Sequence, residues 1–237
     1  MVVVIQCAAT KRKNAGHLRC RDGRNVMFVA NPDAAGASDR LVYARPDDFS
    51  DTVGESWRSV LREYNKHPRK NRHGLLPAWQ LYDNPIYGRL KEHFGLDGLY
   101  ILSAGWGLVS ASCLIPNYDI TFSGAEKVMS LKRRHQRDCY RDFCTLPSNV
   151  DGPIVFLGGK DYRRLFLKLT VNVQNERIVF YAGKKPSGLG CTVRTYRESY
   201  RNRNYRNWHY RCAEALMEGK IRLDCLTERG LSQSCDG

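Results

Sequence analysis

The segment from Cys113 to Phe122 brings together three side chains that could take part in chemistry. Asn117, Tyr118 and Asp119 supply an amide, a phenol and a carboxylate between apolar neighbours. A carboxylate held there could titrate or orient a water molecule, as a hydrolase requires. Asp119 or Asn117 could equally satisfy backbone donors in a turn, which both residue types often do. The segment is therefore a catalytic candidate whose value depends on what lies beside it.

Four other segments rich in small residues each follow an apolar run. Ligands of parallel sheets bind outside the carboxyl ends of the strands, so these segments should converge on one pocket. Small residues let a ligand approach backbone N–H groups, and three of the segments carry lysine, which suits phosphate. Glycine is also common at strand ends for turn geometry alone. Neither GxxxxGK[ST] nor a strand followed by GxGxxG occurs, which argues against triphosphates and dinucleotides. The segments are 7–11, 103–107, 158–162 and 182–188.

The strongest concentration of positive charge lies near the C-terminus. Residues 184–211 hold eight Lys or Arg against one acid, Glu198, and are interleaved with Tyr and Trp. Basic side chains bind phosphates, and aromatic faces either stack on unpaired bases or pack as a helical stripe. Smaller basic clusters at 11–13, 66–72 and 132–134 could each be a solvated face. The whole chain carries a net charge of +14, which points to a polyanion such as nucleic acid.

The elements that position these residues follow from hydrophobic periodicity. Four short runs rich in β-branched and aromatic residues predict buried strands of a mostly parallel sheet, and a further strand at Val26–Val29 is expected at a sheet edge. Helical segments separate the runs, so the fold class is α/β, a three-layer sandwich. The chain is expected to form one domain, 1–237, with its basic, aromatic-rich segment at about 184–211. The four runs are Val2–Cys7, Leu99–Ser103, Ile154–Leu157 and Ile178–Tyr181.

Helices are expected at four places. Residues 57, 60, 61 and 64 form one apolar stripe, and Asn84 with Pro85 starts a second helix. Ser123 and Glu126 form a capping box that predicts a third helix running toward Phe143. A last helix carries residues 208, 212 and 216.

Cysteine usage and hydropathy bound the environment. The nine cysteines are odd in number and contain no CxxC pair, which favours free thiols over disulfides. The six histidines are scattered without ligand spacing, so no metal and no other cofactor are expected. No membrane-spanning run is present, and the opening apolar stretch is followed by basic residues, unlike a secretion signal. A cytoplasmic protein without a membrane or an obligate protein partner is expected.

Several of these motifs occur together, in order, in a known family. The opening strand with its lysine turn, Leu81-Tyr82, the block Ile101–Leu108, Asn117–Asp119 and Phe156–Tyr162 resemble the YaaA-type proteins over roughly residues 2–181. The resemblance implies a fold similar to uracil-DNA glycosylases and DNA binding. In one longer branch it implies a phage-defence glycosylase that excises glucosylated hydroxymethylcytosine. The long segment 11–51 and the basic tail look more like that branch.

The leading hypothesis is therefore a monofunctional DNA glycosylase that flips a modified nucleotide and hydrolyses its N-glycosidic bond. Asp119 is expected to stabilise the oxocarbenium-like sugar and orient water, and Asn117 to position that water. Trp106 is expected to stack on or wall in the base, and Tyr118 to shape the pocket. Substrate contacts are expected from Cys7, Thr10, Ser103, Gly105, Trp106, Tyr118, Gly159 and Asp161. DNA phosphates are expected at Lys11, Lys13, Lys160, Lys184, Lys185 and Arg194.

Two hypotheses from other classes stay open. A non-catalytic DNA-binding stress protein of the YaaA type needs the basic surface and the pocket but no hydrolysis. An RNA-modifying accessory domain is the third, because related domains are appended to enzymes similar to tRNA-guanine transglycosylases. Release of free base from phage-type modified DNA, unmodified DNA or tRNA separates the three.

Overall fold

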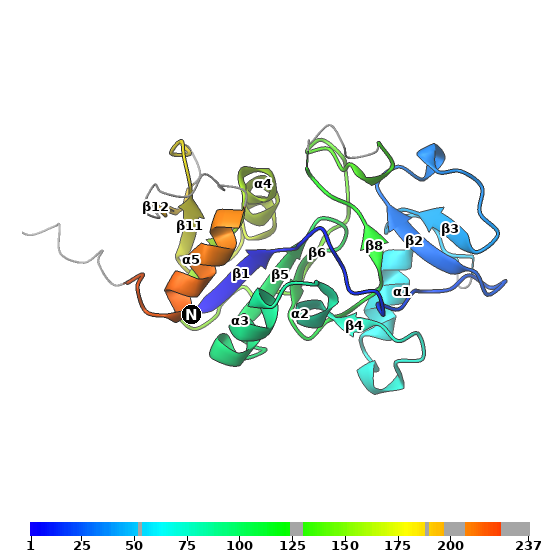
Figure 1. The fold of residues 1–237 in the computed structure, drawn as a ribbon, viewed down its shortest axis with the longest axis horizontal. Coiled ribbons are helices and arrows are strands. Elements are labelled where there is room, and N and C mark those ends of the chain that lie inside the picture. The colour runs from blue at the N-terminus through cyan, green and yellow to red at the C-terminus, as the bar shows by residue number, and fades with distance from the viewer. Residues whose placement is uncertain (52–53, 124–129, 188–189, 197–206, 224–237) are drawn as a thin grey trace, which may run out of the picture.

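The computed structural model describes residues 1–51, 54–123, 130–187, 190–196 and 207–223. Its main sheet has seven strands in the order β12-β11-β10-β1-β5-β6-β9, and all pair in parallel except β5 with β6 (Figure 1). The fold is thus α/β with a mostly parallel central sheet, as predicted. These strands are β1 Val2–Gln6, β5 Leu99–Ser103, β6 Gly107–Ser110, β9 Phe143–Cys144, β10 Ile154–Leu157, β11 Arg177–Tyr181 and β12 Thr192–Thr195.

The four predicted apolar runs became four adjacent strands, β11, β10, β1 and β5. Side chains of β10 and β5 are buried along their whole length, on both faces of the sheet. Burial on both faces explains why these runs show no alternation of apolar and polar residues. β12 was not predicted, because it is a half-buried strand at the sheet edge.

Helices cover the sheet on both faces. α3 packs against α5 on one face (Figure 1). α4 lies in the connection from β10 to β11, and α3 lies in the connection from β1 to β5. These two connections run in opposite directions along the sheet. Because such connections are right-handed, α4 lies on the face opposite to α3. The helices are α1 Trp57–Tyr64, α2 Ala78–Leu81, α3 Ile86–Phe94, α4 Lys160–Leu169 and α5 Trp208–Met217, with 3-10 turns η1 Pro32–Ala34, η2 Pro68–Lys70 and η3 Ser130–Lys132.

Three of the four predicted helices are confirmed, and the third is wrong. The helix expected from Ser123 toward Phe143 begins in residues 124–129, which lie outside the described residues, but 130–142 contain only η3 and loops. Arg134 in this stretch is buried and ion-paired with Asp142. Both Nη atoms of Arg134 donate to the carboxylate of Asp142, eight residues further along the chain. The chain must bend back for this contact, and a straight helix would keep the two residues apart.

Two smaller sheets extend the fold beyond β6. β3 Leu41–Ala44, β2 Asn25–Val29 and β8 Tyr118–Asp119 pair in parallel, and β4 Leu76–Pro77 pairs with β7 Leu114–Ile115. The strand predicted at Val26–Val29 exists, but it is central in its sheet instead of at an edge. The small sheet with β2 and β3 lies at the opposite end of the molecule from β12 (Figure 1).

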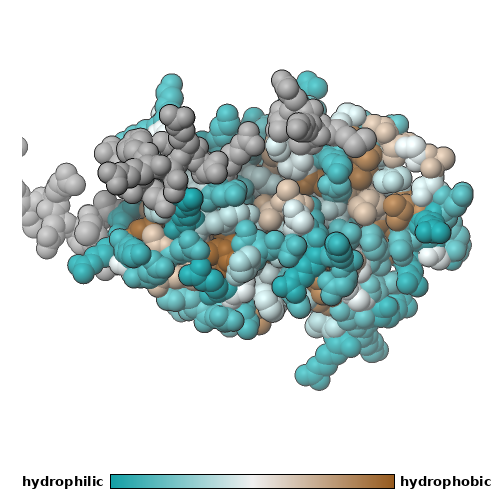
Figure 2. Space-filling model, in the orientation of Figure 1, coloured by the Kyte–Doolittle hydropathy of each residue, from teal (hydrophilic) through white to brown (hydrophobic). Residues whose placement is uncertain are grey.

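The surface of the molecule is polar on the face seen in Figure 2. The face seen in Figure 2 is mostly hydrophilic, with apolar residues scattered among polar ones. No helix among the described residues combines the length and the apolar character needed to cross a bilayer.

Candidate functional site

The point where the strand order reverses, at which a crevice is expected at the carboxyl edge of the sheet, lies between β1 and β10. The connection that leaves β1 runs toward β5, and the one that leaves β10 runs toward β11, so the two loops diverge there. Polar groups from the two loops pair across this point. The Gly159 N–H donates to Gln6 Oε1 at 2.6 Å, and Cys7 Sγ lies 3.2 Å from the Tyr162 hydroxyl. The Gly159 amide that we expected to bind substrate is therefore already occupied by Gln6.

A second cluster of hydroxyl groups lies at the end of β5. Ser103 Oγ donates to the Tyr118 hydroxyl at 2.8 Å, and the Tyr82 and Tyr118 hydroxyls are 2.9 Å apart. Burial raises the pKa of Tyr82 and Tyr118 well above the ordinary value, so both phenols stay protonated. The structure thus brings together Ser103 and Tyr118, as predicted, and adds Tyr82, which no site prediction included.

Two buried arginines, Arg58 and Arg134, bind the backbone of the turn between β5 and β6. Arg58 donates to the carbonyls of Gly105 and Trp106 at 3.0 and 3.1 Å, and Arg134 donates to that of Ala104 at 2.7 Å. The N–H groups of residues 105 and 106 donate to Ser103 Oγ instead. Peptide groups on both sides of this turn are therefore satisfied within the protein, and the turn is a rigid part of the fold.

The substrate contacts expected from Gly105 and Trp106 do not fit this arrangement. A Cβ at residue 105 would lie 3.1 Å from the Tyr118 ring, so glycine there makes room for a tyrosine. Trp106 is completely buried, and its ring packs edge-on against Phe28 with centroids 4.9 Å apart. Trp106 therefore belongs to the core, and the prediction that it stacks on a base is wrong.

Asp119 lies beside two lysines. Its Oδ2 is 2.6 Å from Lys132 Nζ, and 40% of its side chain is exposed. Lys11 Nζ stands 4.1 Å from the centre of the Tyr118 ring. Burial lowers the pKa of Lys11, with Cys7 and Asp119 acting in the opposite direction and Lys132 adding to the decrease. The carboxylate is thus accessible, oriented by an ammonium group and close to a second one.

The other predicted residues are more scattered. Thr10, Lys13, Lys160, Lys184 and Lys185 are exposed, and Asn117 and Asp161 are half-buried. The backbone N–H of Asn117 donates to the Gly16 carbonyl at 2.8 Å, which fixes this part of the chain but does not test the side-chain roles considered for it. Arg194 donates to the carbonyls of Arg222 and Leu223, so its guanidinium is engaged by the chain and not presented to a phosphate. Residues 197–206 of the basic segment lie outside the described residues.

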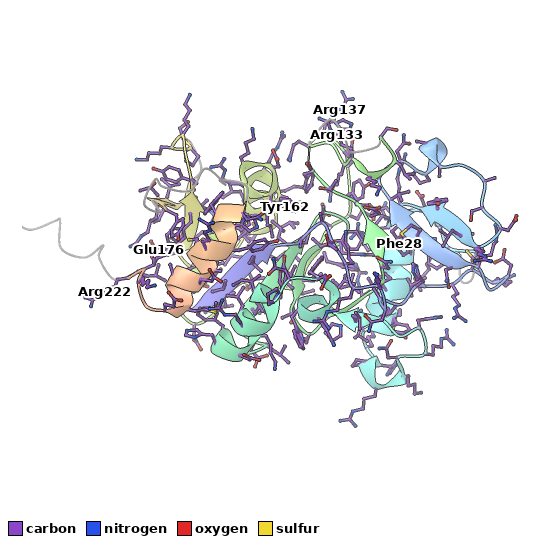
Figure 3. The ribbon with its side chains drawn as sticks, in the orientation of Figure 1. Phe28, Arg133, Arg137, Tyr162, Glu176 and Arg222 are labelled. Carbon is purple, nitrogen blue, oxygen red and sulfur yellow. The ribbon has the colours of Figure 1, made fainter. Side chains whose placement is uncertain are left out.

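Sequence reasoning missed the segment 130–142, although the cluster Lys132-Arg133-Arg134 was a signal. These neighbours take three roles: Lys132 pairs with Asp119, Arg134 is buried, and Arg133 lines a pocket of about 520 Å³. A smaller pocket of about 270 Å³ is lined by residues 134–140 together with residues of α4. Arg133 and Arg137 project from the same edge of the molecule (Figure 3). None of the lysines and arginines that line these pockets belonged to the predicted site.

Within the described part of the chain, the cysteines at 7, 20, 113, 139, 144, 191 and 212 are free thiols. No three His, Cys, Asp or Glu side chains among the described residues lie where they could hold a metal ion. The groups available for chemistry are therefore the carboxylate of Asp119, the amines of Lys11 and Lys132, the buried hydroxyls and the Cys7 thiol.

Comparisons of the chain with protein-family models, with curated proteins and with solved structures found no match. Function is therefore inferred from the geometry and charge of the chain's own residues, together with the resemblance of its sequence motifs.

Proposed function

We propose that the protein is a DNA glycosylase that flips a modified base out of the duplex and hydrolyses its N-glycosidic bond. The observation that carries the proposal is Asp119, a partly exposed carboxylate with lysine ammonium groups beside it on a chain of net charge +14. The family resemblance supplies the finer parts: a fold like that of uracil-DNA glycosylases, glucosylated hydroxymethylcytosine as the base, and a role in defence against phage.

The reaction needs negative charge where Asp119 provides it. When the base leaves, the sugar becomes oxocarbenium-like, and a carboxylate below it stabilises the positive charge and orients the attacking water. The target bond is unreachable inside a duplex, so the nucleotide must first be extruded. Abasic DNA and free base are the products.

Lys132 gives the site a means of activation. In the free protein its ammonium group neutralises Asp119 at 2.6 Å. A DNA phosphate beside the flipped nucleotide would compete for that ammonium group, and the carboxylate would then present its full charge to the sugar. Lys11 stands on the other side, over the Tyr118 ring, where it would bind a neighbouring phosphate.

Asp119→Asn tests the proposal, because it keeps size and removes charge. If the carboxylate contributes about 3–4 kcal/mol to the transition state, single-turnover base release should fall roughly a hundred- to a thousandfold. DNA affinity and the melting temperature should stay close to those of the parent. Substrates are a duplex with glucosylated hydroxymethylcytosine, the unmodified duplex and tRNA.

Asp97→Asn is the matched control, since it removes the same charge from an exposed carboxylate. Asp97 precedes β5, at the end of this strand away from Ser103. It should release base at the parental rate. Parental release by Asp119→Asn would remove this residue from catalysis, and Asp161 would be tested next. DNA binding by the parent without release from any substrate would assign the protein to a binding role instead.

A further inference from the structure

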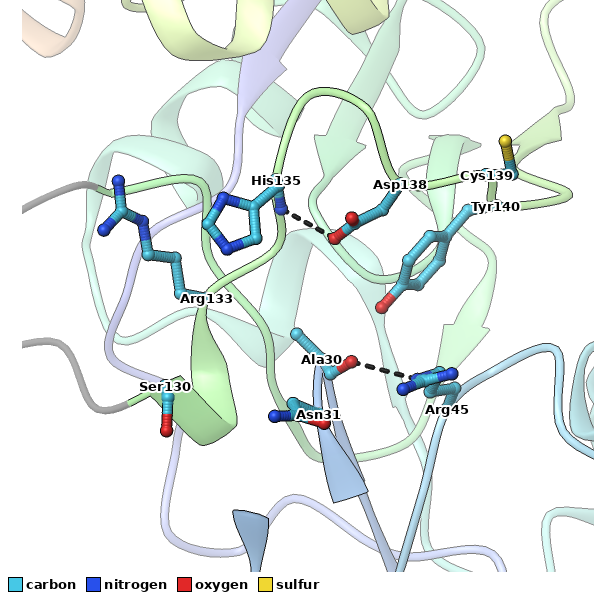
Figure 4. A pocket seen from close by; sticks show the side chains of 9 residues that line it. All are labelled: Ala30, Asn31, Arg45, Ser130, Arg133, His135, Asp138, Cys139 and Tyr140. Atoms are coloured by element: carbon cyan, nitrogen blue, oxygen red, sulfur yellow. Dashed lines mark hydrogen bonds between the residues drawn. The ribbon is translucent and has the colours of Figure 1, made fainter. Parts of the chain in front are cut away.

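The 520 Å³ pocket, which we call the Tyr140 pocket, is formed by parts of the chain that no site prediction included. Its walls are the end of β2, the residue after β3, and the segment 130–140 (Figure 4). It adjoins the Asp119 site, because two of its lining residues are sequence neighbours of residues that contact Asp119. Ala30 follows Val29, which pairs with Asp119, and Arg133 follows Lys132. A ligand in this pocket would therefore lie near Asp119 without occupying its position.

One buried polar atom in the pocket has no partner. Tyr140 is 8% exposed, and among the described residues its hydroxyl makes no hydrogen bond. Figure 4 shows this hydroxyl pointing into the space between Arg45 and His135. Burial raises the pKa of Tyr140 to about 12, so the hydroxyl remains a donor at neutral pH. A buried donor without an acceptor is unfavourable, and an acceptor supplied by a ligand would satisfy it.

The charged groups around this hydroxyl are mostly basic. Arg45 donates its Nε to the Ala30 carbonyl at 3.1 Å, which fixes the guanidinium, while its Nη2 has a contact of only 4.0 Å to the exposed Asp33. Arg133 is exposed, and its side chain makes no hydrogen bond or ion pair with the described residues. The acids near it are Asp47 and Asp138, and Asp138 Oδ2 accepts the backbone N–H of His135 at 2.7 Å. The pocket thus offers guanidinium and hydroxyl donors together.

The wall behind the hydroxyl is rigid. The guanidinium carbon of Arg134 stands 3.8 Å from the centre of the Tyr140 ring, and Arg134 is itself fixed by Asp142. Tyr140 is therefore held in place before any ligand arrives. Guanidinium groups and a fixed hydroxyl donor are the groups that bind phosphate oxygens. The volume exceeds that of a phosphate and is in the range of small-molecule sites, which leaves room for a nucleoside.

We propose that the Tyr140 pocket binds a phosphate ester of nucleotide size, with the phosphate held by Arg45, Arg133 and the Tyr140 hydroxyl. The phosphate comes either from a free mononucleotide or from a nucleotide within a nucleic-acid strand. This site goes beyond the proposed function, since it requires no bond cleavage. Base release is not scored in its test, so failure of the glycosylase proposal would leave the result unchanged.

The test is titration calorimetry with deoxycytidine monophosphate, deoxycytidine, inorganic phosphate and a short single-stranded oligonucleotide. The phosphorylated ligands should bind, and deoxycytidine should bind at least tenfold more weakly than its monophosphate. Tyr140→Phe and Arg133→Gln should each weaken binding about tenfold, the loss of one charge-assisted hydrogen bond. Arg69→Gln, an exposed cation on η2 outside both pockets, is the control and should bind as the parent does.

The fold is monitored separately. Tyr140→Phe should melt at the parental temperature or above it, because it removes a buried hydroxyl without a partner. Weakened binding of the oligonucleotide alone assigns the phosphate to a strand, and weakened binding of the mononucleotide assigns it to a free nucleotide. Equal affinity for deoxycytidine and its monophosphate, no binding of any phosphorylated ligand, or parental affinity in both pocket variants would overturn the proposal.

Discussion

Arg134 joins two regions that use arginine and tyrosine in different ways. On one side it donates to Ala104 in the β5–β6 turn, and on the other it stacks over Tyr140. At the turn, the Tyr118 hydroxyl bonds to Ser103 and to Tyr82, and the arginines bind carbonyls. In the Tyr140 pocket, the tyrosine hydroxyl has no partner in the described chain. The backbone groups of the turn are bonded within the protein, and its one unpartnered side-chain donor, Trp106 Nε1, lies in the core, whereas the unpartnered Tyr140 hydroxyl lines a pocket.

The difference shows how to separate architecture from function among buried polar groups. A group with partners in the protein stabilises the fold and gains little from a ligand, because an existing bond would have to be broken. A group without partners either awaits a ligand or lowers stability. The sequence suggested that the turn was the ligand site, but the carbonyls of residues 104–106 and the N–H groups of residues 105 and 106 are bonded within the protein. Mutations that break each region should therefore have opposite signatures.

The largest effect is expected from Arg134→Met, which leaves Asp142 buried and unpaired. The Asp142 side chain is 1% exposed and accepts two bonds from Arg134. Removal of one partner of a buried pair lowers the free energy of unfolding by about 3–5 kcal/mol. Urea unfolding followed by circular dichroism measures this. Arg137→Met, an exposed neighbour, should stay within about 0.5 kcal/mol of the parent.

A double variant identifies the cause of that loss. Arg134→Met combined with Asp142→Asn removes the uncompensated charge and should recover part of the stability lost in Arg134→Met. No recovery would mean that the loss comes from the Ala104 and Tyr140 contacts of Arg134, and the turn would then depend on packing more than on the ion pair.

The next largest effect concerns His209, a buried group without a partner among the described residues that lines neither the Tyr140 pocket nor the smaller pocket beside it. Both ring nitrogens lack partners among the described residues, and burial lowers its pKa from 6.5 to about 4. Between these values the unfolded chain binds a proton that the folded chain does not. Stability is therefore full above pH 6.5 and falls as the pH drops toward 4, by ~3 kcal/mol.

His209→Leu removes this titration. Its free energy of unfolding at pH 7 should equal or exceed that of the parent, and its decrease from pH 6.5 to 4 should be smaller by ~3 kcal/mol. Urea unfolding at half-unit pH steps measures both. An identical pH dependence in parent and variant would show that His209 has a partner in the folded protein. His209 would then resemble the satisfied turn and not the Tyr140 pocket.

The sequence predicted the central strands because their burial is a local property. Every residue of Ile154–Leu157 is buried, and a run of apolar residues is enough to show it. The turn at Gly105 could not be interpreted in the same way. Its arginine partners come from positions 47 and 30 residues away in the chain. Small residues after a strand are compatible with a ligand or with a distant side chain, and only the fold distinguishes the two.

The candidate site was predicted only in part, because local sequence does not show which distant side chains a loop residue contacts. Asp119 was chosen for its residue type and its neighbours, and the structure leaves it accessible. Lys132, Arg133 and Arg134 are alike in charge, yet one pairs with Asp119, one lines a pocket and one is buried. Consecutive residues of a loop point in different directions without a fixed period, so a charge cluster there does not predict which side chain does what.

The smallest effect, and the one that extends the comparison to the surface, is expected from Lys184 and Lys185. They are exposed just after β11, in a segment that the sequence favoured for phosphate contact. Each lost duplex contact lowers the slope of log affinity against log salt by about 0.9, so the double alanine variant should lower it by about 1.8. The affinity should fall similarly for different sequences, because phosphates carry no sequence information. Lys66→Ala with Lys70→Ala, two exposed lysines on the α1 side, is the matched control for charge.

A parental slope after loss of Lys184 and Lys185, together with a reduced slope in the Arg133→Gln variant, would place the nucleic acid along the Tyr140 pocket instead of the carboxyl end of β11. A reduced slope in both would require a strand long enough to run from β11, past Asp119, to Arg133. The salt dependence therefore decides whether the exposed lysines and the pocket bind the same nucleic acid.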